Sequence, residues 1–217
     1  MPWPVHPTGF FGARGDSDTY RIERSLRFNS ADSAYLSRTP TVNGNQKIAT
    51  LSLWVKRTKF TPIVKYSILT DSVGSGSIAW LFFNPSDQLQ FYINGAGDGL
   101  TSSAVYRDTS AWYHIVCAID TTQTTSTNRI KLYVNGNQIT QFSGTTTYYS
   151  QDATPQININ SREMRLGQAA SDTFDGYMTE VNWVDGQALT PSSFGETDAI
   201  TGRWKAKAYS GTYGTNG

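Results

Sequence analysis

Carboxylates are the side chains of this sequence best suited to acid–base chemistry, so their spacing is the first test of a catalytic function. The chain has only four glutamates, Glu23, Glu163, Glu180 and Glu196. Two carboxylates that cleave a glycosidic bond must face the same space, and side chains on a β-strand face the same way at every second residue. None of the four glutamates has another acid two residues away on a predicted strand. We therefore expect no catalytic residues and no enzymatic activity.

Nucleophiles and zinc ligands are also scarce. His114 and Cys117 share a predicted strand, but a separation of three residues places their side chains on opposite faces. We expect His114 to be packed and hydrogen-bonded, and Cys117 to be a buried apolar side chain. The single cysteine forms no internal disulfide, and a zinc site would lack ligands.

Calcium is the one metal that the sequence leaves open. Ca²⁺ prefers oxygen ligands. Asp172 and Asp175 flank the turn before a predicted strand at residues 177–184, and Asp120 follows another at residues 112–119. These three aspartates are the candidate calcium ligands. Aspartate in a tight turn also serves the turn geometry alone, and that alternative stays open. No other cofactor is expected.

Exposed aromatic rings with polar neighbours are what a sugar-binding site needs. Tyr148 and Tyr149 lie in a loop rich in Ser, Thr and Gly, and Tyr106 is a third candidate. We predict these three tyrosines as ligand-binding residues. The alternative is that their rings cover the edge of the fold.

The composition favours an all-β protein that neither binds nucleic acid nor inserts into a membrane. Of 217 residues, 38% are hydrophobic and 16% charged, and the formal net charge is +1. Helices usually require more Glu, Lys and Ala, so this balance favours sheets. A net charge near zero gives no attraction to nucleic acid or to an anionic membrane. No apolar run approaches the roughly 20 residues that span a bilayer, and the first residues lack a signal-peptide pattern.

Alternation of apolar and polar residues predicts a series of short strands separated by turns, and hardly any helix. The predicted strands are residues 26–28, 35–36, 48–55, 64–69, 78–83, 89–93, 112–119, 130–134, 138–142, 157–159, 164–166 and 177–184. In the last strand both faces carry large apolar groups, so we expect a β-bulge that changes the buried face partway. Asn94-Gly95 and Asn135-Gly136 predict hairpin turns, and Thr190-Pro191 predicts one helical turn capped by Thr190.

The chain divides into three parts by its pattern. Residues 1–24 predict an extended N-terminal arm, in which Trp3, Phe10 and Phe11 are too apolar for a simple tether and are predicted to dock onto another surface. Residues 25–194 predict one antiparallel, two-sheet sandwich. Residues 195–217 form an extension rich in Gly, Thr and Tyr, in which no strand is predicted.

Three segments resemble the concanavalin A-like, laminin G-like jelly rolls. They are Leu51-Ser-Leu-Trp-Val-Lys56, the pair Trp112-Tyr-His-Ile-Val and Ile130-Lys-Leu-Tyr-Val-Asn-Gly136, and Phe174-Asp-Gly-Tyr-Met-Thr-Glu-Val. The resemblance covers roughly residues 25–194 and implies a two-sheet antiparallel jelly roll. Glucanases of this fold carry Glu-x-Asp-x-Glu on one strand, a pattern absent here, while laminin G-like relatives often bind calcium through loop carboxylates.

A narrower resemblance is to bacteriophage structural proteins that carry this jelly roll. It rests on residues 22–40, on Val184-Asp-Gly-Gln-Ala-Leu-Thr-Pro-Ser-Ser-Phe-Gly-Glu-Thr-Asp198 and on Ala208-Tyr-Ser-Gly-Thr-Tyr-Gly-Thr-Asn-Gly217. In those proteins the last segment usually leads into another apolar strand. Here we expect either a shortened protein or a last strand supplied by a neighbouring subunit.

These resemblances imply a non-enzymatic virion component, such as a fibre, tail or capsid decoration protein. We expect it to be made in the host cytoplasm, to form homo-oligomers, and to bind other virion proteins through its arm. Its jelly roll is expected to bind a glycan of the host surface. The alternatives are a free carbohydrate-binding, lectin-like module and, more remotely, a polysaccharide-degrading enzyme.

Overall fold

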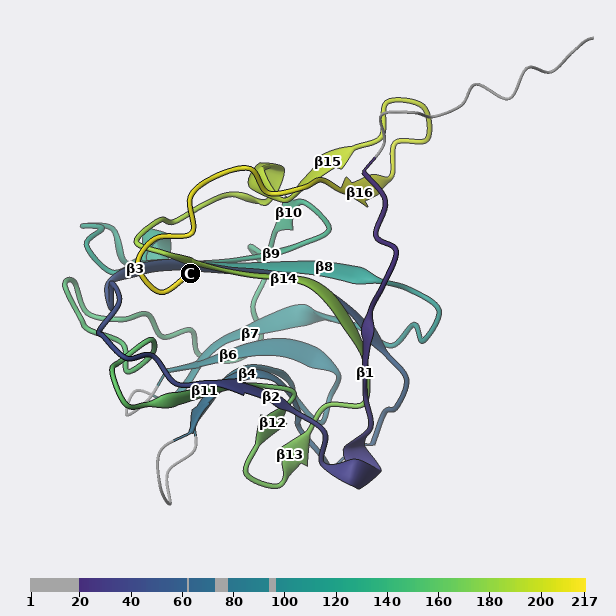
Figure 1. Ribbon diagram of the computed structural model, residues 1–217, viewed down its shortest axis with the longest axis horizontal. Helices are drawn as coiled ribbons and strands as arrows, with labels where there is room; N and C mark the ends of the chain where they lie inside the picture. The colour runs from purple at the N-terminus through teal and green to yellow at the C-terminus, as the bar shows by residue number, and fades with distance from the viewer. Residues whose placement is uncertain (1–19, 62, 73–77, 94–96) are drawn as a thin grey trace, which may run out of the picture.

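Two antiparallel sheets packed face to face form the body of the protein (Figure 1). The computed structural model describes residues 20–61, 63–72, 78–93 and 97–217. Each main sheet has six strands, and sequence-distant strands lie side by side in both. The predicted all-β, two-sheet antiparallel jelly-roll sandwich is therefore confirmed. The predicted arm residues Trp3, Phe10 and Phe11 lie outside the described residues.

The first sheet, which we call the upper sheet after its place in Figure 1, contains the strand with the predicted bulge. Its strands, in spatial order, are β1 (Leu26–Phe28), β14 (Gly176–Asp185), β3 (Ile48–Arg57), β8 (Tyr113–Asp120), β9 (Ile130–Val134) and β10 (Asn137–Gln138).

The second, lower sheet lies beneath it. Its strands, in spatial order, are β2 (Leu36–Arg38), β11 (Glu163–Leu166), β4 (Tyr66–Ser72), β5 (Ile78–Phe83), β6 (Gln88–Ile93) and β7 (Gly97–Val105). Two small sheets add β12 (Gln168–Ala169) with β13 (Asp172–Thr173), and β15 (Gly195–Thr197) with β16 (Trp204–Ala206). The short 3₁₀ turns are η1 (Ser30–Asp32), η3 (Ser126–Asn128) and η4 (Pro191–Ser193).

The main core lies between the two sheets and follows the period-two alternation of the sequence. Leu51, Leu53 and Val55 of β3 all project into it, as do Ile115 and Cys117 of β8. Burying such aliphatic side chains stabilises the fold by about 1.5–3 kcal/mol each. Cys117 is a buried free cysteine, as expected, and burial raises the pKa of its thiol.

The predicted bulge occurs in β14. The register of β14 against β3 shifts between Thr179 and Asn182, and Glu180 within it has φ +50°. Before the bulge Met178 faces the main core; after it Trp183 does, while Val184 turns to the outer face of the upper sheet. One inserted irregularity thus lets a single strand bury apolar groups on both faces.

The C-terminal extension folds back over the outer face of the upper sheet and buries a second, smaller core. Phe194 packs there with Val116 and Val184, and Tyr209 packs against Phe194 at 4.9 Å between ring centroids. The prediction that residues 195–217 contain no strand is wrong, because β15 and β16 pair within them. Both strands are only three residues long, too short for a visible alternation.

Four local predictions need correction or lie beyond the described chain. Residues 157–159 are not a strand, since Asn158 has φ +59°. The predicted strand at residues 138–142 is reduced to β10. Thr190 precedes the predicted helical turn η4, but its side chain makes no capping hydrogen bond. The turn Asn94-Gly95 lies outside the described residues.

Candidate functional site

A group of tryptophans lies on the outer face of the upper sheet, the face on which Figure 1 shows β15 and β16. Trp54 of β3 stands beside His114 of the neighbouring strand β8, since the two residues are register partners. Both project away from the main core because Leu53 and Ile115, next to them in the chain, project into it. Trp112, just before β8, and Trp204 of β16 complete the group. We call the two adjoining hollows that these three tryptophans line the tryptophan basin.

His114 is the fixed centre of the basin. Its ring lies 4.9 Å from that of Trp54 and 5.9 Å from that of Trp204, with interplanar angles of 23° and 20°. Trp204 Nε1 donates to His114 Nδ1 at 2.9 Å, and His114 Nε2 lies 2.9 Å from Ser52 Oγ. An indole N–H only donates, so Nδ1 carries no proton and Nε2–H donates to Ser52.

The protonation state of His114 follows from its burial. The residue is 1% exposed, and this burial lowers the pKa of His114 to about 4. His114 is therefore neutral at pH 7 and holds its neighbours through hydrogen bonds rather than charge. The prediction of a packed, hydrogen-bonded histidine is confirmed.

Two glycines create the space for the Trp204 ring. A Cβ atom at Gly136 would stand 2.6 Å from the indole, and one at Gly195 would stand 2.5 Å from it. Gly136 also has φ +82°, a conformation that glycine adopts readily. The hairpin turn after β9 and the strand β15 thus both approach the Trp204 ring, and a larger residue at either glycine would displace it.

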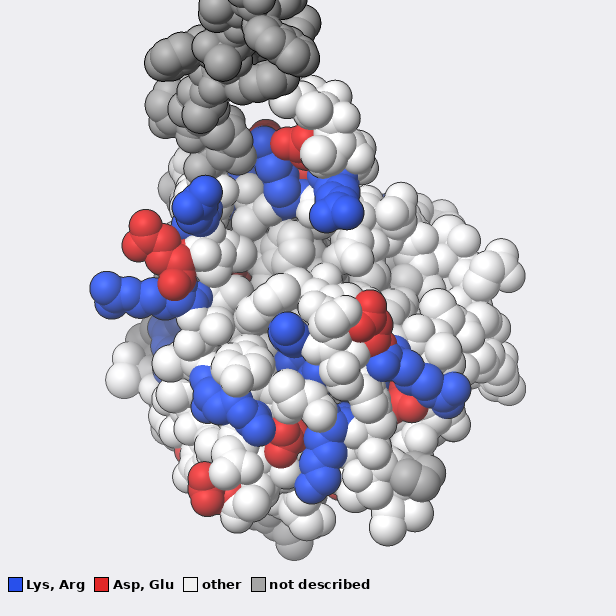
Figure 2. Space-filling view, turned by 90° about the vertical axis from the view of Figure 1, so that its right-hand side faces the viewer, with Lys and Arg blue, Asp and Glu red and all other residues white. Residues whose placement is uncertain are grey.

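The hollows of the basin measure about 450 Å³ and 840 Å³, within the range of small-ligand sites. Trp112 is half-buried and lies 6.5 Å from Tyr177 between ring centroids. Around the tryptophans stand groups that donate or accept hydrogen bonds: Asp108, Ser110, Asn135, Asn137, Arg203, Arg21, Glu23, Arg24 and Lys205. Figure 2 looks onto this side of the molecule, where basic side chains gather around a hollow in the upper part of the described surface.

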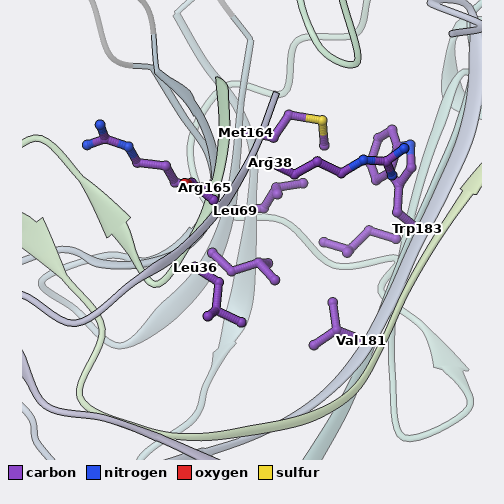
Figure 3. A pocket seen from close by; sticks show the side chains of 10 residues that line it. Leu36, Arg38, Leu69, Met164, Arg165, Val181 and Trp183 are labelled. Atoms are coloured by element: carbon purple, nitrogen blue, oxygen red, sulfur yellow. The ribbon is translucent and has the colours of Figure 1, made fainter. Parts of the chain in front are cut away.

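A second cavity has the opposite character. It measures about 140 Å³ and lies between the two sheets, on the side where β2 and β14 face each other. Figure 3 shows Leu36 and Met164 of the lower sheet pointing across the gap toward Val181 and Trp183 of the upper sheet, while Arg165 points away. We call it the inter-sheet slot. Its lining is Leu36, Ser37, Arg38, Leu51, Leu69, Met164, Arg165, Leu166, Val181 and Trp183.

None of the three predicted sugar-binding tyrosines lines the tryptophan basin. Tyr106 is 8% exposed, and its ring packs between Phe83 and Tyr113 at 5.9 and 5.3 Å. Tyr149 stands edge-on to Phe91 at 6.3 Å, and burial raises the pKa of its hydroxyl. Tyr148 is half-buried against the main core. Their loops fold onto the sandwich, so the alternative that these rings cover its edge describes them better.

The three predicted calcium ligands are likewise dispersed into separate structural roles. Asp175 accepts hydrogen bonds from Ser30 and Thr58 and pairs with Arg27 at 2.8 Å. Burial raises the pKa of Asp175, but these hydrogen bonds outweigh it and lower that pKa to about 2. Asp120 closes its own turn by accepting from Thr122 and Gln123. Asp172 lies on β13.

Across the part of the chain that the structure describes, no three His, Cys, Asp or Glu side chains gather as a metal-binding group. The three aspartates therefore do not form one such group. Asp175 instead fastens the start of the chain to the entry of β14.

One pair of acidic residues lies close together although the sequence predicts no such pair on a strand. Glu196 lies on β15, and Asp198 follows two residues later. Both carboxylates approach Lys205 Nζ, at 3.3 and 3.4 Å. Hydrogen bonds from the backbone and hydroxyl of Thr201 lower the pKa of Asp198 to about 2. Because Asp198 stays ionised, it is unsuited to act as a general acid.

The tryptophans of the basin were missed at the sequence level, although part of the signal is present. Trp54 and Trp112 both fall on the faces opposite the aliphatic ones, with His114 on the same side as Trp112. Large aromatics on the outer faces of two central strands indicate either a covering segment or a ligand. Trp204 could not be placed, because it reaches His114 from 90 residues away.

The chain belongs to the concanavalin A-like lectin/glucanase superfamily, whose laminin G-like family model matches residues 28–193. That range holds both main sheets except the first two residues of β1. Among curated proteins, none matches this chain. In the described residues there is no helix of the length and apolarity needed to cross a membrane.

Solved structures similar to this chain include two kinds of carbohydrate-active protein. A Trypanosoma rangeli sialidase in complex with the inhibitor DANA has 17% identity and a TM-score of 0.55, over 80% of this chain and 27% of that one. The same sialidase with sialic acid has 18% identity and a TM-score of 0.47, over 68% of this chain and 22% of that one. Domain 4 of AbnA, a GH43 extracellular arabinanase from Geobacillus stearothermophilus, was solved in complex with arabinotriose. It has 18% identity and a TM-score of 0.47, over 77% of this chain and 73% of that one.

These likenesses describe the fold. The chain spans about a quarter of the length of the sialidases that it matches.

Proposed function

We propose that this chain is a non-enzymatic glycan-binding module and that the tryptophan basin is its binding site. The observation that carries the proposal is the convergence of the half-buried Trp112 and Trp204 with the more deeply buried Trp54, from three distant parts of the chain, beside polar side chains at the surface. Indole rings offer flat apolar platforms to the C–H faces of sugars, and surrounding amides and guanidinium groups bond their hydroxyls.

The proposal of a binding module rather than an enzyme is supported by the acidic residues. Retaining and inverting glycosidases need a protonated carboxylic acid and a second carboxylate on opposite sides of one bond. At the basin, Asp108 is exposed, and its Oδ1 accepts from the Ser110 hydroxyl at 2.6 Å. These bonds lower the pKa of Asp108, which disfavours the protonated form.

A glycan array with matched variants tests this function. The wild-type protein is expected to bind a subset of glycans, Trp112→Ala to lose them, and Leu36→Ala, at the mouth of the slot, to keep them. If no glycan binds above background, with and without calcium, the proposal falls. Release of reducing sugar from a bound polysaccharide would instead favour the enzymatic alternative.

We further propose that the module belongs to a bacteriophage virion, in a fibre, tail or capsid decoration protein. The resemblance of residues 22–40, 184–198 and 208–217 to phage structural proteins supports it. In the structure, the last two of these segments are joined to each other, since Asp185 N donates to Tyr213 O at 2.8 Å. A virion attachment protein would use the basin on host-surface glycans and the aromatic residues of the N-terminal arm, residues 1–24, on other virion proteins. Mass spectrometry of purified virions should detect the chain; its absence there would leave the free lectin-like module.

The proposed homo-oligomer has a candidate contact surface beside the slot, where three exposed apolar side chains line a neighbouring hollow. Leu26, Leu36 and Val181 are 55%, 46% and 39% exposed, and β1 and β2 are the edge strands of their sheets. Exposed apolar groups at unpaired strand edges favour association. Light scattering should show oligomers that Leu36→Lys weakens and Lys59→Gln does not; a wild-type monomer at all concentrations would contradict the contact.

A further inference from the structure

We infer that the tryptophan basin selects anionic glycans, those that carry carboxylate, sulfate or phosphate groups, over neutral ones. This inference rests on the proposed glycan-binding function and specifies the ligand of the same site. It comes from the arginines of the chain rather than from the tryptophans.

Ten arginines lie in the described part of the chain, and seven of them donate hydrogen bonds to described residues: Arg27, Arg38, Arg57, Arg107, Arg129, Arg162 and Arg165. The guanidinium groups of the other three, Arg21, Arg24 and Arg203, make no hydrogen bond or ion pair with a described residue. All three of these line the basin. The described arginines that have no partner among the described residues are therefore those that line the basin.

The other charged residues that line the basin are one lysine and two acids. Lys205 is held between Glu196 and Asp198 at 3.3 and 3.4 Å, so its single charge is already paired with two carboxylates and is not free for a ligand. The acidic lining residues are Glu23, beside the two N-terminal arginines, and Asp108, whose carboxylate is engaged by Ser110. Among the residues that line the basin, the three guanidinium groups thus face two carboxylates, those of Glu23 and Asp108.

Guanidinium groups suit this role chemically. The guanidinium is planar and always charged, and its N–H groups match the two oxygens of a carboxylate or the oxygens of sulfate and phosphate. The half-buried Trp112 ring in the same hollow as Arg21 and Arg24 supplies a stacking surface for the sugar ring that carries the charge. A neutral glycan would use the rings alone.

The test is an array of matched pairs in which each anionic glycan has an uncharged partner with the same backbone. Oligogalacturonate and its methyl ester form one pair, and sulfated and unsulfated oligosaccharides form another. We expect the anionic member of at least one pair to bind more tightly, and the preference to shrink when salt rises from 50 to 500 mM. A single-stranded oligonucleotide is included, since stacking rings and arginines also suit nucleic acid.

The variants assign the preference to the arginines. Each of Arg21→Gln, Arg24→Gln and Arg203→Gln is expected to weaken the anionic ligand by roughly two- to fivefold, and to leave the neutral partner unchanged. Lys47→Gln removes the same charge at the far end of β3, where Lys47 pairs only with the exposed Asp152. It is expected to change neither ligand. Thermal melting of each variant shows that the fold is kept.

The outcomes separate this inference from the function on which it rests. If neutral members bind as tightly as anionic ones, the anionic preference is wrong while glycan binding stands. If the oligonucleotide binds more tightly than any glycan, both the preference and the ligand class are wrong. If no member of any pair binds, the proposed function falls and this inference falls with it.

Discussion

Trp204 in the tryptophan basin and Trp183 in the inter-sheet slot have contrasting surroundings. In the basin, the indole N–H of Trp204 donates to the buried Nδ1 of His114. In the slot, the indole Nε1 of Trp183 is buried and has no hydrogen-bond partner among the described residues. The Trp204 indole is held by a specific donor–acceptor pair, whereas the Trp183 indole packs against the main core without such a pair among the described residues.

The two cavities arise in different ways. The slot is part of the main core and is lined almost wholly by apolar side chains where the sandwich opens at its edge. The basin lies outside that core and is assembled by a covering segment, β15–β16, on a sheet that already buries its other face. A polar network fixes the basin rings at the surface, which suits a binding site, while the slot offers shape alone.

Acid pH should produce the largest difference between the two regions. The pKa of His114 is about 4 in the folded chain and near 6.5 when unfolded, so the unfolded state binds the proton more tightly. Its contribution to stability is complete above pH 6.5 and is lost as the pH falls toward 4, about 3 kcal/mol in total. Urea unfolding of wild type and His114→Gln across this range measures the difference; parallel profiles would contradict it.

Truncating a basin ring should have the next largest effect. Trp112→Ala is expected to cost about 2 kcal/mol of glycan binding, a loss of roughly 30-fold. Leu36→Ala in the slot should leave the affinity within about twofold. Calorimetric titration with the best glycan from the array makes the comparison. Equal losses in the two variants would mean that the basin is not the binding site.

Replacing each of the two contrasted tryptophans by phenylalanine isolates the indole N–H. Trp204→Phe leaves the buried His114 Nδ1 without its donor, at a cost of about 1–3 kcal/mol. Trp183→Phe removes a buried N–H that has no partner among the described residues, so its stability should fall less. Chemical denaturation of both variants gives the two values. A larger loss for Trp183→Phe would show that ring volume, and not the hydrogen bond, decides.

The smallest expected effect concerns the space around Trp204. Gly195→Ala places a Cβ against the indole, which must move at a cost of about 1 kcal/mol. Ser192→Ala, at a nearby exposed position, is the control. Near-ultraviolet circular dichroism should report the moved ring in Gly195→Ala. An unchanged spectrum and melting temperature would show that the ring adapts freely.

The sheets could be predicted from the sequence because strand alternation is a local signal. Leu51, Leu53 and Val55 define a buried face by period two alone, and the two-sided apolar pattern of residues 177–184 indicated the bulge. The short β15 and β16 could not be predicted, since three residues carry no periodicity.

The candidate site was harder to predict than the fold. Whether an aromatic ring is exposed depends on which loop covers it, a tertiary property that the local sequence does not contain. Tyr106 and Trp54 are both only 8% exposed, yet Tyr106 packs against Phe83 while Trp54 lines the basin beside the more exposed Trp112. The pairing of Trp204 with His114 depends on how the extension folds back.

The most direct test of the central claim is to follow the indole N–H resonances of the six tryptophans while the best-binding glycan is added to ¹⁵N-labelled protein. Binding in the basin predicts that the signals of Trp112 and Trp204 shift with saturation, while that of Trp183 in the slot stays in place. Shifts confined to Trp183, or saturable binding that moves neither basin signal, would contradict the claim that the tryptophan basin is the glycan site.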